Sequence, residues 1–490
     1  MKTPFDMSTM DKAKEAANEP TKPNSIFGVR HVQCALIFFA LAVTYGLRVN
    51  MSVAIVVMTD NTTNPNYPEY HWEEKARSVI LSSFFWGYVI TQVPAGQLAQ
   101  KFGAKLVVFW GLTICSILAI LTPICAEIGG SALVIALRVI QGLCQGTVFP
   151  STHTLVAKWA PLKERGRLGT ISYSGAQFGT AVMLAVSGEL ASSSMGWPSI
   201  FYASGGMGLV WAVLWFFFAS SSPSENRFVS EEEKAYIEWV PTIENSEPKS
   251  AQKLSTPWKS IFTSMPFLVL LLSHCSNNWG FWTLLTEMPT YMKNILDLNI
   301  KDSAILSSLP YWGMFGMCFV FVFISELLNR NPCMSLSFSR KFFNSLGLWV
   351  PMIGLIGMGY MNKDHVEWAV VLLTLTVSMN AACYLGFQMN HIDLSPNYAG
   401  TLMGITNGAA NIMSIIAPLL VGFIVTDEKN PSQWRIIFFI AAAVYLVGNS
   451  LFIAFGKVET QPWNEPKKSV TNGQTSAQNP TRIIVVESRY

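Results

Sequence analysis

The sequence predicts an all-α membrane protein with twelve transmembrane helices in two halves of six and with both termini in the cytoplasm. A shortage of charge, twelve apolar runs of helical length and basic residues in alternate turns predict this fold. Only 13% of the 490 residues are charged, whereas soluble globular chains carry about 25%. A large soluble core would not remove surface charge, so much of the surface faces lipid.

The apolar runs divide evenly about a polar stretch. A membrane-spanning helix needs about 20 mainly apolar residues. The candidate spans are 32–57, 79–99, 105–126, 131–157, 170–190 and 199–219, then 266–292, 304–324, 342–360, 367–389, 399–425 and 436–455. They predict an N-terminal cytoplasmic tail (1–30), an N-terminal half (31–219), a cytoplasmic linker (220–265), a C-terminal half (266–456) and a C-terminal cytoplasmic tail (457–490). The first 27 residues have no apolar core before Ile26, so we expect the first span, rather than a signal peptide, to direct insertion.

Basic residues indicate which turns face the cytoplasm. The turn after the second span holds Lys101 and Lys105, and the turn after the fourth holds four basic residues within "KWAPLKERGRLG". Because cytoplasmic loops carry an excess of Lys and Arg, these even-numbered turns are cytoplasmic. The loop before the second span is acidic and therefore external. Asn61 begins "NTT" in that loop, and we expect it to be glycosylated.

The linker contains a short helical signal. In Ser222–Val240, Ser230 is a helix-capping residue that precedes Glu231, Glu232 and Glu233. This pattern predicts a cytoplasmic amphipathic helix, with the run of glutamates as a solvated face. It does not predict a catalytic domain.

Two internal similarities indicate related halves. "ILSSFFWGY" (Ile80–Tyr88), in the second span, is repeated as "ILSSLPYWGM" (Ile305–Met314) in the eighth. "GRLGTISYSG" (Gly166–Gly175), in the fifth span, is more weakly repeated as "GTLMGITNG" (Gly400–Gly408) in the eleventh. Each pair lies at corresponding places in its half.

The turn "GQLAQKFGAK", Gly96 to Lys105, combines small and basic residues. We expect Gly96 to allow a close helix approach and Gly103 to permit the chain reversal. Lys101 and Lys105 would hold the turn at the cytoplasmic surface. An ordinary basic loop would explain the lysines but not both glycines.

Ionisable residues inside spans usually mark a pathway or an ion pair. Arg48 lies about 24 Å along the first span, and Arg138 lies about 10 Å inside the outer end of the fourth. Two arginines at similar depth, with no carboxylate in either span, predict a cavity that attracts an anion. The structural alternative is an interhelical pair, or side chains that reach to the interface.

Two further positions in the seventh span, Asn277 and Glu287, are candidates for coupling or gating. Glu287 is either an interfacial carboxylate or a gate residue, cation ligand or arginine partner. The polar segment "SHCSNN" includes His274 and Asn277 and could supply neutral ligands. A lone histidine such as His274 is more often a hydrogen-bonded helix contact than a proton relay.

Composition argues against other classes of site. The eight cysteines are scattered without a CxxC pair, so neither a zinc site nor a disulfide framework is indicated. The net charge of +3 is too small to suggest a nucleic-acid partner. A membrane enzyme would need a nucleophile or histidine–carboxylate cluster, and none is evident. A receptor or channel would not explain the repeated halves.

The chain resembles the phosphate and organic-anion cotransporter branch of the major facilitator superfamily, which includes the type I sodium/phosphate cotransporters, sialin and the vesicular glutamate transporters. The turn is similar to the superfamily motif G-x-L-A-D-R-x-G-R-R, with Gln100 in place of the acidic residue. The resemblance is strongest to the insect-type inorganic phosphate cotransporters. It is carried by "RVNMSVAIV" (Arg48–Val56), "SSFFWGYVITQVPAGQLA" (Ser82–Ala99), "RVIQGLCQG" (Arg138–Gly146), "KWAPLKERGRL" (Lys158–Leu168), "TLLTEMPTYM" (Thr283–Met292) and "NHIDLSPNYAGTLMGITNG" (Asn390–Gly408).

The resemblance implies that Arg48 and Arg138 bind the anion. It also shows departures. Gln145 stands where the vesicular glutamate and sialin members have a proton-coupling glutamate, and Leu81 and Asn277 replace a histidine and an arginine of the glutamate transporters. Glutamate loading of vesicles is therefore not expected. The type I phosphate members share the glutamine, and sodium coupling enters by this resemblance alone.

The sequence thus predicts a secondary transporter of small anions that works by alternating access, with sodium-coupled phosphate symport as the favoured reaction. The alternative is a voltage- or proton-driven transporter of an organic anion such as urate, an acidic sugar or an acidic amino acid. Arg48 and Arg138 are the expected substrate ligands, with Gln145, Asn277, Glu287 and Asn407 as coupling or gating candidates. No cofactor is expected beyond Na⁺ as coupling ion. We expect a monomer in the plasma membrane, with a vesicular or lysosomal membrane as the alternative.

Overall fold

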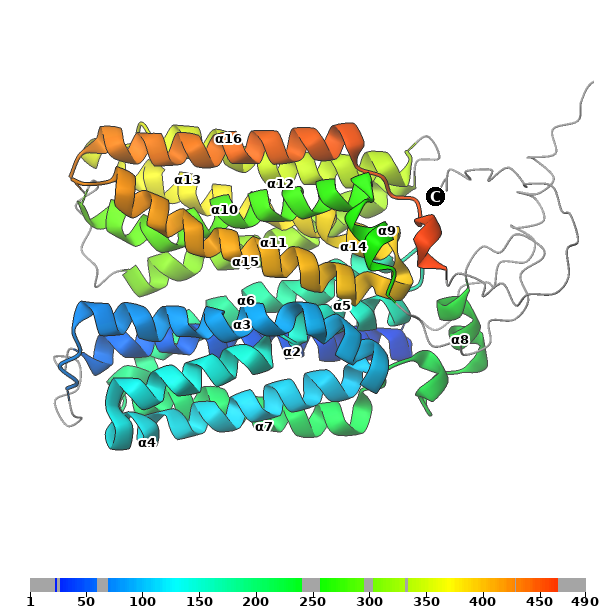
Figure 1. Cartoon of the computed structure of the whole chain (residues 1–490), viewed down its shortest axis with the longest axis horizontal. Coiled ribbons are helices and arrows are strands. Elements are labelled where there is room, and N and C mark those ends of the chain that lie inside the picture. Colours follow the sequence, from blue (N-terminus) through cyan, green and yellow to red (C-terminus); the bar gives the residue numbers. More distant parts are fainter. Residues whose placement is uncertain are drawn as a thin grey trace, which may run out of the picture.

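The computed structural model describes residues 23, 27–59, 69–239, 256–294, 303–330, 334–427 and 429–465. Within them the chain forms two helical bundles that lie side by side (Figure 1). The first bundle contains α2 (Val29–Met58), α3 (Glu74–Phe102), α4 (Ala104–Gln145), α5 (Val148–Trp159), α6 (Arg165–Ser192) and α7 (Pro198–Phe218). The second contains α10 (Met265–Asn294), α11 (Ser303–Asn329), α12 (Leu336–Met358), α13 (Val366–Met379), α14 (Phe387–Leu394), α15 (Ala399–Ile424) and α16 (Pro431–Phe455). The all-α fold with two related halves is confirmed.

The helices account for the twelve expected spans. In the described part of the chain, nine segments are long and apolar enough to cross a membrane, and one of them, Ala104–Trp159, has 56 residues and holds two spans. Gly130 separates those two spans, since its φ of 54° and ψ of −147° interrupt the helix within α4. The remaining two spans, α6 and α10, are the more polar ones. α6 buries Ser, Thr and Gln side chains against the bundle interior, which explains its low hydropathy.

The fourth and tenth spans are broken, a difference from the continuous helices predicted over 131–157 and 367–389. The fourth span pauses at Gly146 and Thr147 before α5. A Cβ on Gly146 would collide with Thr91 and with the carbonyl oxygen of Tyr88, so close packing against α3 requires glycine there. The tenth span passes from α13 through the 3₁₀ turn η4 (Asn380–Tyr384) to α14. Broken helices are typical of transporter binding sites because they bring polar backbone and side chains to a cavity.

The two halves pack crosswise. α3 packs against α15, and α6 packs against α11. The second and fifth spans of the first half therefore contact the eleventh and eighth spans, which are the corresponding helices of the second half in exchanged order. The turn between α3 and α4 adopts the predicted reversal at Gly103, whose φ is 84°. The predicted close approach of helices at Gly96 is also present, since a Cβ on Gly96 would lie 2.5 Å from the backbone nitrogen of Thr401 in α15.

Polar bonds join the halves at their cytoplasmic ends. The side-chain amide of Gln100 donates to the carbonyl oxygen of Asn397 at 2.8 Å. Arg167, at the start of α6, donates to Glu326, near the end of α11, at 2.8 Å. With the Gly96–Thr401 contact, these bonds close the cytoplasmic side of the interface.

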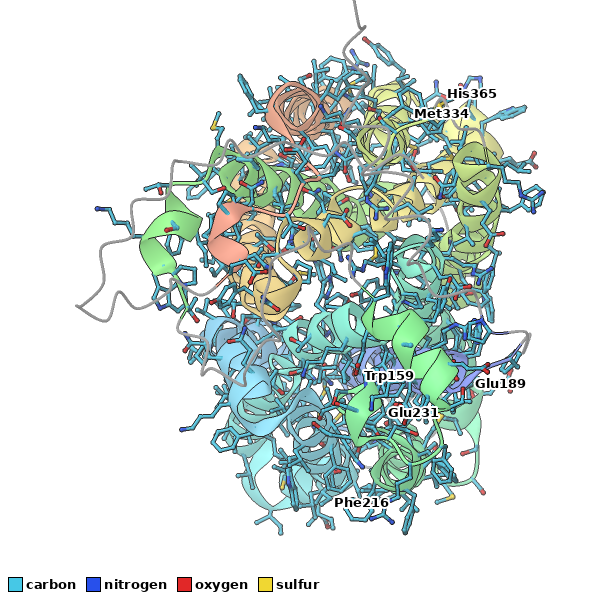
Figure 2. The ribbon with its side chains drawn as sticks, turned by 90° about the vertical axis from the view of Figure 1, so that its right-hand side faces the viewer. Trp159, Glu189, Phe216, Glu231, Met334 and His365 are labelled. Carbon is cyan, nitrogen blue, oxygen red and sulfur yellow. The ribbon has the colours of Figure 1, made fainter. Side chains whose placement is uncertain are left out.

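The linker forms the predicted helix, α8 (Glu231–Glu238), and the Ser230 hydroxyl accepts from the backbone N–H of Glu233 at 3.2 Å. Figure 2 looks onto this end of the molecule and shows α8, labelled at Glu231, against the N-terminal bundle. The prediction that the whole glutamate run is solvated was wrong. Glu233 is buried, because its carboxylate binds the Arg30 guanidinium at 2.8 Å and the first backbone N–H groups of α2.

Candidate functional site

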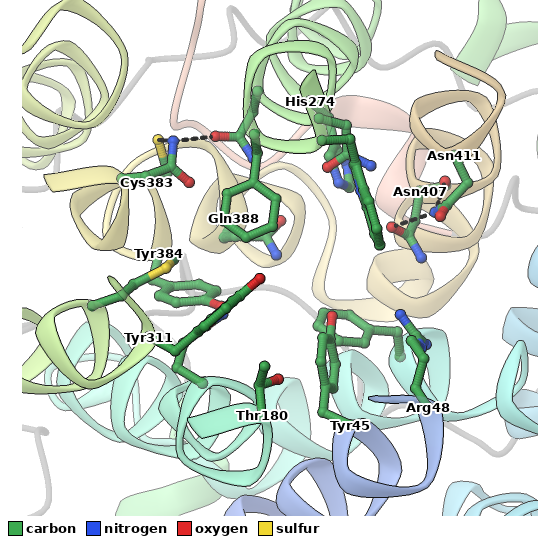
Figure 3. Close-up of a pocket in the computed structure, with 18 of the residues that line it drawn as sticks. Tyr45, Arg48, Thr180, His274, Tyr311, Cys383, Tyr384, Gln388, Asn407 and Asn411 are labelled. Carbon is green, nitrogen blue, oxygen red and sulfur yellow. Dashed lines mark hydrogen bonds between the residues drawn. The ribbon is translucent and has the colours of Figure 1, made fainter. Parts of the chain in front are cut away.

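A cavity of about 120 Å³ lies between the two halves. It is lined by α2, α3, α5 and α6 from the first half and by α10, α11, η4, α14 and α15 from the second. Figure 3 shows its side chains converging from both bundles. Among the described residues that line it, Arg48 is the only one with a permanent charge, and none is Asp or Glu. The electrostatic character of the cavity is therefore positive.

Arg48 is held in place by aromatic rings. Its guanidinium carbon lies 4.6 Å from the ring centres of Tyr45 and Tyr88 and 5.1 Å from that of Phe84. Its Nε donates to the Gln145 side-chain oxygen over 3.4 Å. Cation–π contacts stabilise the cation without neutralising it. Its buried Nη2 has no hydrogen-bond partner among the described residues, so donor capacity remains for a ligand.

Arg138 lies behind Phe84. Its guanidinium carbon is 4.8 Å from the centre of that ring, on which Arg48 also packs. Its Nη1 donates to Gln141 at 3.1 Å. The two guanidinium groups therefore pack against the same aromatic ring and lie at the same level, but Arg138 does not line the cavity in this conformation. Its role as a substrate ligand stays a prediction.

Gln145 also lies behind the cavity wall. It accepts from Arg48 and its amide nitrogen contacts the Cys115 sulfur at 3.3 Å. Gln145 thus positions Arg48 rather than facing the ligand. A neutral side chain at this place leaves the charge of Arg48 available.

The C-terminal half supplies a wall of amides. Asn277 accepts from Asn380 at 2.7 Å, and both line the cavity. Asn407 donates across the interface to the Tyr88 hydroxyl at 3.1 Å and to the Gln92 side-chain oxygen at 3.0 Å. The N–H groups of Asn380 and Asn407 are engaged, since Asn380 also donates to the Gly347 carbonyl oxygen at 3.1 Å. Among these three residues, Asn277 can therefore donate to an anion, and the amide oxygens can serve as neutral ligands for a cation.

The remaining predicted residues have other positions. Glu287 falls within α10, but its side chain is outside the described residues, and so is Asn61. Lys105 donates from Nζ to the carbonyl oxygen of Phe216, near the C-terminal end of α7, at 2.8 Å. Lys101 lies against the Phe102 ring. These lysines are therefore at the cytoplasmic end, remote from the cavity.

Sequence reasoning missed a cluster of histidines. His153 of α5, His274 of α10 and His391 of α14 are buried together, and the ring centre of His391 lies 5.6 Å from that of His153 and 5.8 Å from that of His274. The residues are far apart in the chain, so no spacing could reveal the cluster. The one available signal was that "NHIDL" and "SHCSNN" place histidines within apolar spans.

Comparisons with known proteins agree with this architecture. The family model described as Major Facilitator Superfamily matches residues 37–418. A Drosophila melanogaster protein named "Putative inorganic phosphate cotransporter" is 38% identical over 474 residues, covering 91% of this chain and 88% of that protein. Human "Sialin" is 36% identical, covering 89% of this chain and 90% of its own length.

Proteins with lower sequence identity also match over most of the chain. "Vesicular glutamate transporter 1" of Xenopus laevis is 32% identical, covering 93% of this chain and 80% of that protein. The crystal structure of the transporter FucP in its outward conformation superposes with a TM-score of 0.63 at 14% identity, covering 86% of this chain and 99% of the other. That likeness supports the fold alone.

The helix count, the two crosswise halves, the central cavity and these matches agree over nearly the whole folded chain. The chain therefore belongs to the Major Facilitator Superfamily, as a multi-pass membrane transporter and not an enzyme.

Proposed function

We propose that this protein is a symporter of small anions, with inorganic phosphate as substrate and Na⁺ as coupling ion. The observation that carries the proposal is Arg48, a buried cation at the cavity wall whose Nη2 has no described partner. A buried charge without a counter-ion is costly. An entering anion would supply the missing countercharge.

The geometry of Arg48 suits an oxyanion. Guanidinium presents a planar fork of donors that matches carboxylate or phosphate oxygens, and it does not deprotonate. The rings of Tyr45 and Tyr88 pack against the group, and its Nη2 is left to donate to the ligand. The side-chain amide of Asn277 lines the same cavity and can donate to a further oxygen of the ligand.

The size of the cavity favours a small substrate. Its volume of about 120 Å³ is well below the ~300 Å³ at which pockets for drug-sized ligands begin. A tetrahedral oxyanion is compatible with this space, whereas a large sugar acid would require the halves to separate. The relative named as an inorganic phosphate cotransporter, 38% identical, supports the same substrate.

Two observations support sodium coupling, namely the oxygen-rich wall of the cavity in the C-terminal half and the family resemblance. Na⁺ is a hard cation that takes oxygen ligands, and Asn277, Asn278 and Asn411 offer amide oxygens at the cavity. Glu287 of the same helix, α10, is the nearest acidic candidate in the sequence. Arg138 would join the anion site when movement of Phe84 opens the wall between the two arginines.

A second candidate is an organic-anion transporter driven by protons or voltage. The relative named as vesicular glutamate transporter 1, at 32% identity, favours it. The same Arg48 would bind the carboxylate. This candidate differs from the first in substrate and driving force, not in the site.

Uptake by purified protein in liposomes tests both candidates. We expect phosphate, rather than urate or glutamate, to accumulate under an inward Na⁺ gradient at constant pH and voltage. Arg48→Ala should reduce uptake at least about tenfold, a loss of ~1.4 kcal/mol of binding. Arg48→Lys should do nearly as much damage, because lysine keeps the charge but loses the planar fork.

Arg435→Lys is the matched control, since Arg435 donates to the Gly359 carbonyl at 3.0 Å and is not among the residues that line the cavity. Abundance in the membrane is measured for each variant. Normal phosphate uptake by Arg48→Ala at normal abundance would contradict the proposed anion site. Accumulation of glutamate or urate under a proton or voltage gradient, without phosphate uptake, would select the second candidate.

A further inference from the structure

The histidine cluster has no part in the anion site proposed above. His153, His274 and His391 are each at most 3% exposed. His153 is on α5 and His391 is on α14, the short segments that follow the breaks in the fourth and tenth spans. They therefore occupy corresponding places in the two halves, on the cytoplasmic side of the cavity. His274 lines the cavity itself, and Figure 3 shows it between the amides and Gln388.

The hydrogen bonds around His391 determine its tautomer. Its Nδ1 lies 3.0 Å from the carbonyl oxygen of Gln388, and a carbonyl can only accept, so Nδ1 carries a proton. In a neutral ring the other nitrogen is then an acceptor. That nitrogen, Nε2, lies 2.7 Å from the hydroxyl oxygen of Thr406. The hydroxyl therefore donates to His391.

The same reasoning assigns the donor and acceptor of the next hydrogen bond, between Thr406 and His274 at the cavity. The hydroxyl has one proton, and its contact with His391 is shorter than its 3.3 Å contact with the Met403 carbonyl. The Thr406 oxygen must then accept from His274 Nδ1, 3.0 Å away. This assignment leaves His274 Nε2 as an unprotonated acceptor that has no hydrogen-bond partner among the described residues. A chain of hydrogen bonds thus runs from the cavity to His391, in which His274 donates to Thr406 and Thr406 donates to His391.

Charge balance in the cavity suggests a function for this chain of hydrogen bonds. Arg48 is the only permanent charge among the described residues lining the cavity, so a doubly charged anion would leave one negative charge unbalanced. Histidine is the side chain whose unperturbed titration falls near physiological pH. His274 is the lining residue of that type.

We propose that His274, Thr406 and His391 form a proton-binding relay, which takes up one proton with the anion. A proton from cavity water adds to the lone pair of His274 Nε2. The Nδ1 proton of His274 passes to the Thr406 oxygen while the hydroxyl proton passes to His391 Nε2. His274 is again neutral, the hydroxyl is restored, and His391 is an imidazolium whose Nδ1–H still donates to Gln388.

The groups around the relay leave His391 as the site of the positive charge. The ionisable hydroxyl groups nearby belong to tyrosines, which are neutral at physiological pH. Asp393, two residues beyond His391, is paired with Arg340 at 2.7 Å, so these two charges offset each other. The titratable or charged groups on the surrounding elements include Cys34, Tyr45 and Arg48 of α2, Tyr88 of α3, Cys115 and Cys144 of α4, Tyr173 of α6, Cys275 of α10, Tyr311 and Cys318 of α11, Arg340 of α12, Cys383 and Tyr384 of η4, Tyr398 of η5 and Tyr445 of α16.

His153 closes the relay on the side of the other half. Its ring stacks on Tyr173 with centres 4.7 Å apart and meets His391 edge-on. Its Nδ1 contacts the Phe149 carbonyl at 3.2 Å, and its buried Nε2 has no partner among the described residues. Because His153 and His391 belong to different halves, opening of the cytoplasmic side separates them. His391 then meets water and releases its proton to the cytoplasm.

This inference rests on anion transport as proposed, but sodium coupling does not require it. The experiment uses full-length protein in liposomes that contain a pH indicator, with equal Na⁺ on both sides and inorganic phosphate as probe. Phosphate entry by the wild type should acidify the lumen, and an inward proton gradient should accelerate uptake. Thr406→Val removes the hydroxyl at nearly constant shape and should reduce both signals at least about tenfold, whereas phosphate exchange should fall much less. Thr406→Ser restores the hydroxyl and should restore both signals.

His274→Gln is a second variant, which tests the relay if Thr406→Val cannot be purified and reconstituted. Glutamine can donate to Thr406 but cannot be protonated, so the pH profile of uptake should flatten. Wild-type acidification and pH profile in either variant would overturn the relay and leave anion transport intact. The relay would also fail if the wild type moved phosphate without acidification. Absence of phosphate uptake under every gradient would instead reject the proposed substrate, and glutamate entry with acidification would then still support the relay.

Discussion

Arg48 shows how a membrane protein can hold a cation without neutralising it. The rings of Tyr45, Phe84 and Tyr88 contact the guanidinium group, and the neutral Gln145 accepts from its Nε. A carboxylate in the place of any of these would form an ion pair and compete with substrate. The glutamine at position 145 therefore leaves the positive charge of Arg48 available for the substrate.

Gln145→Glu tests this view. The new carboxylate would lie beside Arg48 Nε, now 3.4 Å from the glutamine oxygen, and would pair with the guanidinium. We expect anion uptake at neutral pH to fall at least about tenfold, equal to ~1.4 kcal/mol. Acidification should recover part of the activity, because protonation of the glutamate releases Arg48. Uptake against pH is the measurement, and Gln145→Met, which removes the hydrogen bond without adding charge, is the comparison. A wild-type profile for Gln145→Glu would show that Arg48 does not act as a free cation.

At the scale of elements, the linker is part of the N-terminal half. α8 places Glu233 on the N-terminal end of α2, where unpaired backbone N–H groups favour an anion. The same carboxylate binds Arg30, which also binds Glu164 at 2.9 Å. This network ties the linker, α2 and the turn before α6 together at the cytoplasmic surface.

Glu233→Ala should therefore destabilise the transporter. Removal of one member of a buried ion pair costs about 3–5 kcal/mol, and the remaining bond of Arg30 to Glu164 places the expected loss at the lower end. The thermal unfolding midpoint of the detergent-purified protein is the measurement. Glu232→Ala is the matched control, because Glu232 is exposed on the same helix and should leave the midpoint nearly unchanged. Equal midpoints for the two variants would mean that α8 is not docked in solution.

At the scale of the whole molecule, the close approach of α3 and α15 keeps the cytoplasmic side shut. Gly96 meets backbone atoms of Gly400 and Thr401, which cannot move aside as a flexible side chain could. A neighbouring bond, from Gln100 to Asn397, requires an amide donor. The acidic residue usual at this position in the resembling motif could not donate to a carbonyl oxygen.

Gly96→Ala should shift the molecule toward opening on the cytoplasmic side, because its Cβ would lie 2.5 Å from the Thr401 nitrogen. A loss of ~1 kcal/mol from the closed state raises the open population about fivefold. The rate at which an impermeant thiol reagent labels the variant Ala99→Cys from the cytoplasmic face reports that population, since Ala99 is buried one helical turn beyond Gly96 on α3. Gly316→Ala is the control, because nothing lies within 4 Å of its added Cβ. An unchanged labelling rate would indicate that this contact does not set the equilibrium.

Local composition was enough to predict much of the architecture. Apolar runs of about 20 residues can only be helices in lipid, since their backbone groups must bond within the segment. Lys101 and Lys105 indicated sidedness, and the repeat of Ile80–Tyr88 in Ile305–Met314 indicated paired halves. Arg48 could be singled out because an isolated charge in an apolar span is rare.

Only the tertiary structure decided which side chains share the cavity. It packed Arg48 and Arg138 against the same ring of Phe84, turned Gln145 toward Arg48, and joined His153, His274 and His391. These residues lie on separate helices, and their contacts depend on the rotation and crossing of each helix and on the breaks before α5 and α14. Hydropathy and charge act along one chain segment at a time and therefore determine the helices and their orientation, whereas the site arises from packing between segments far apart in sequence.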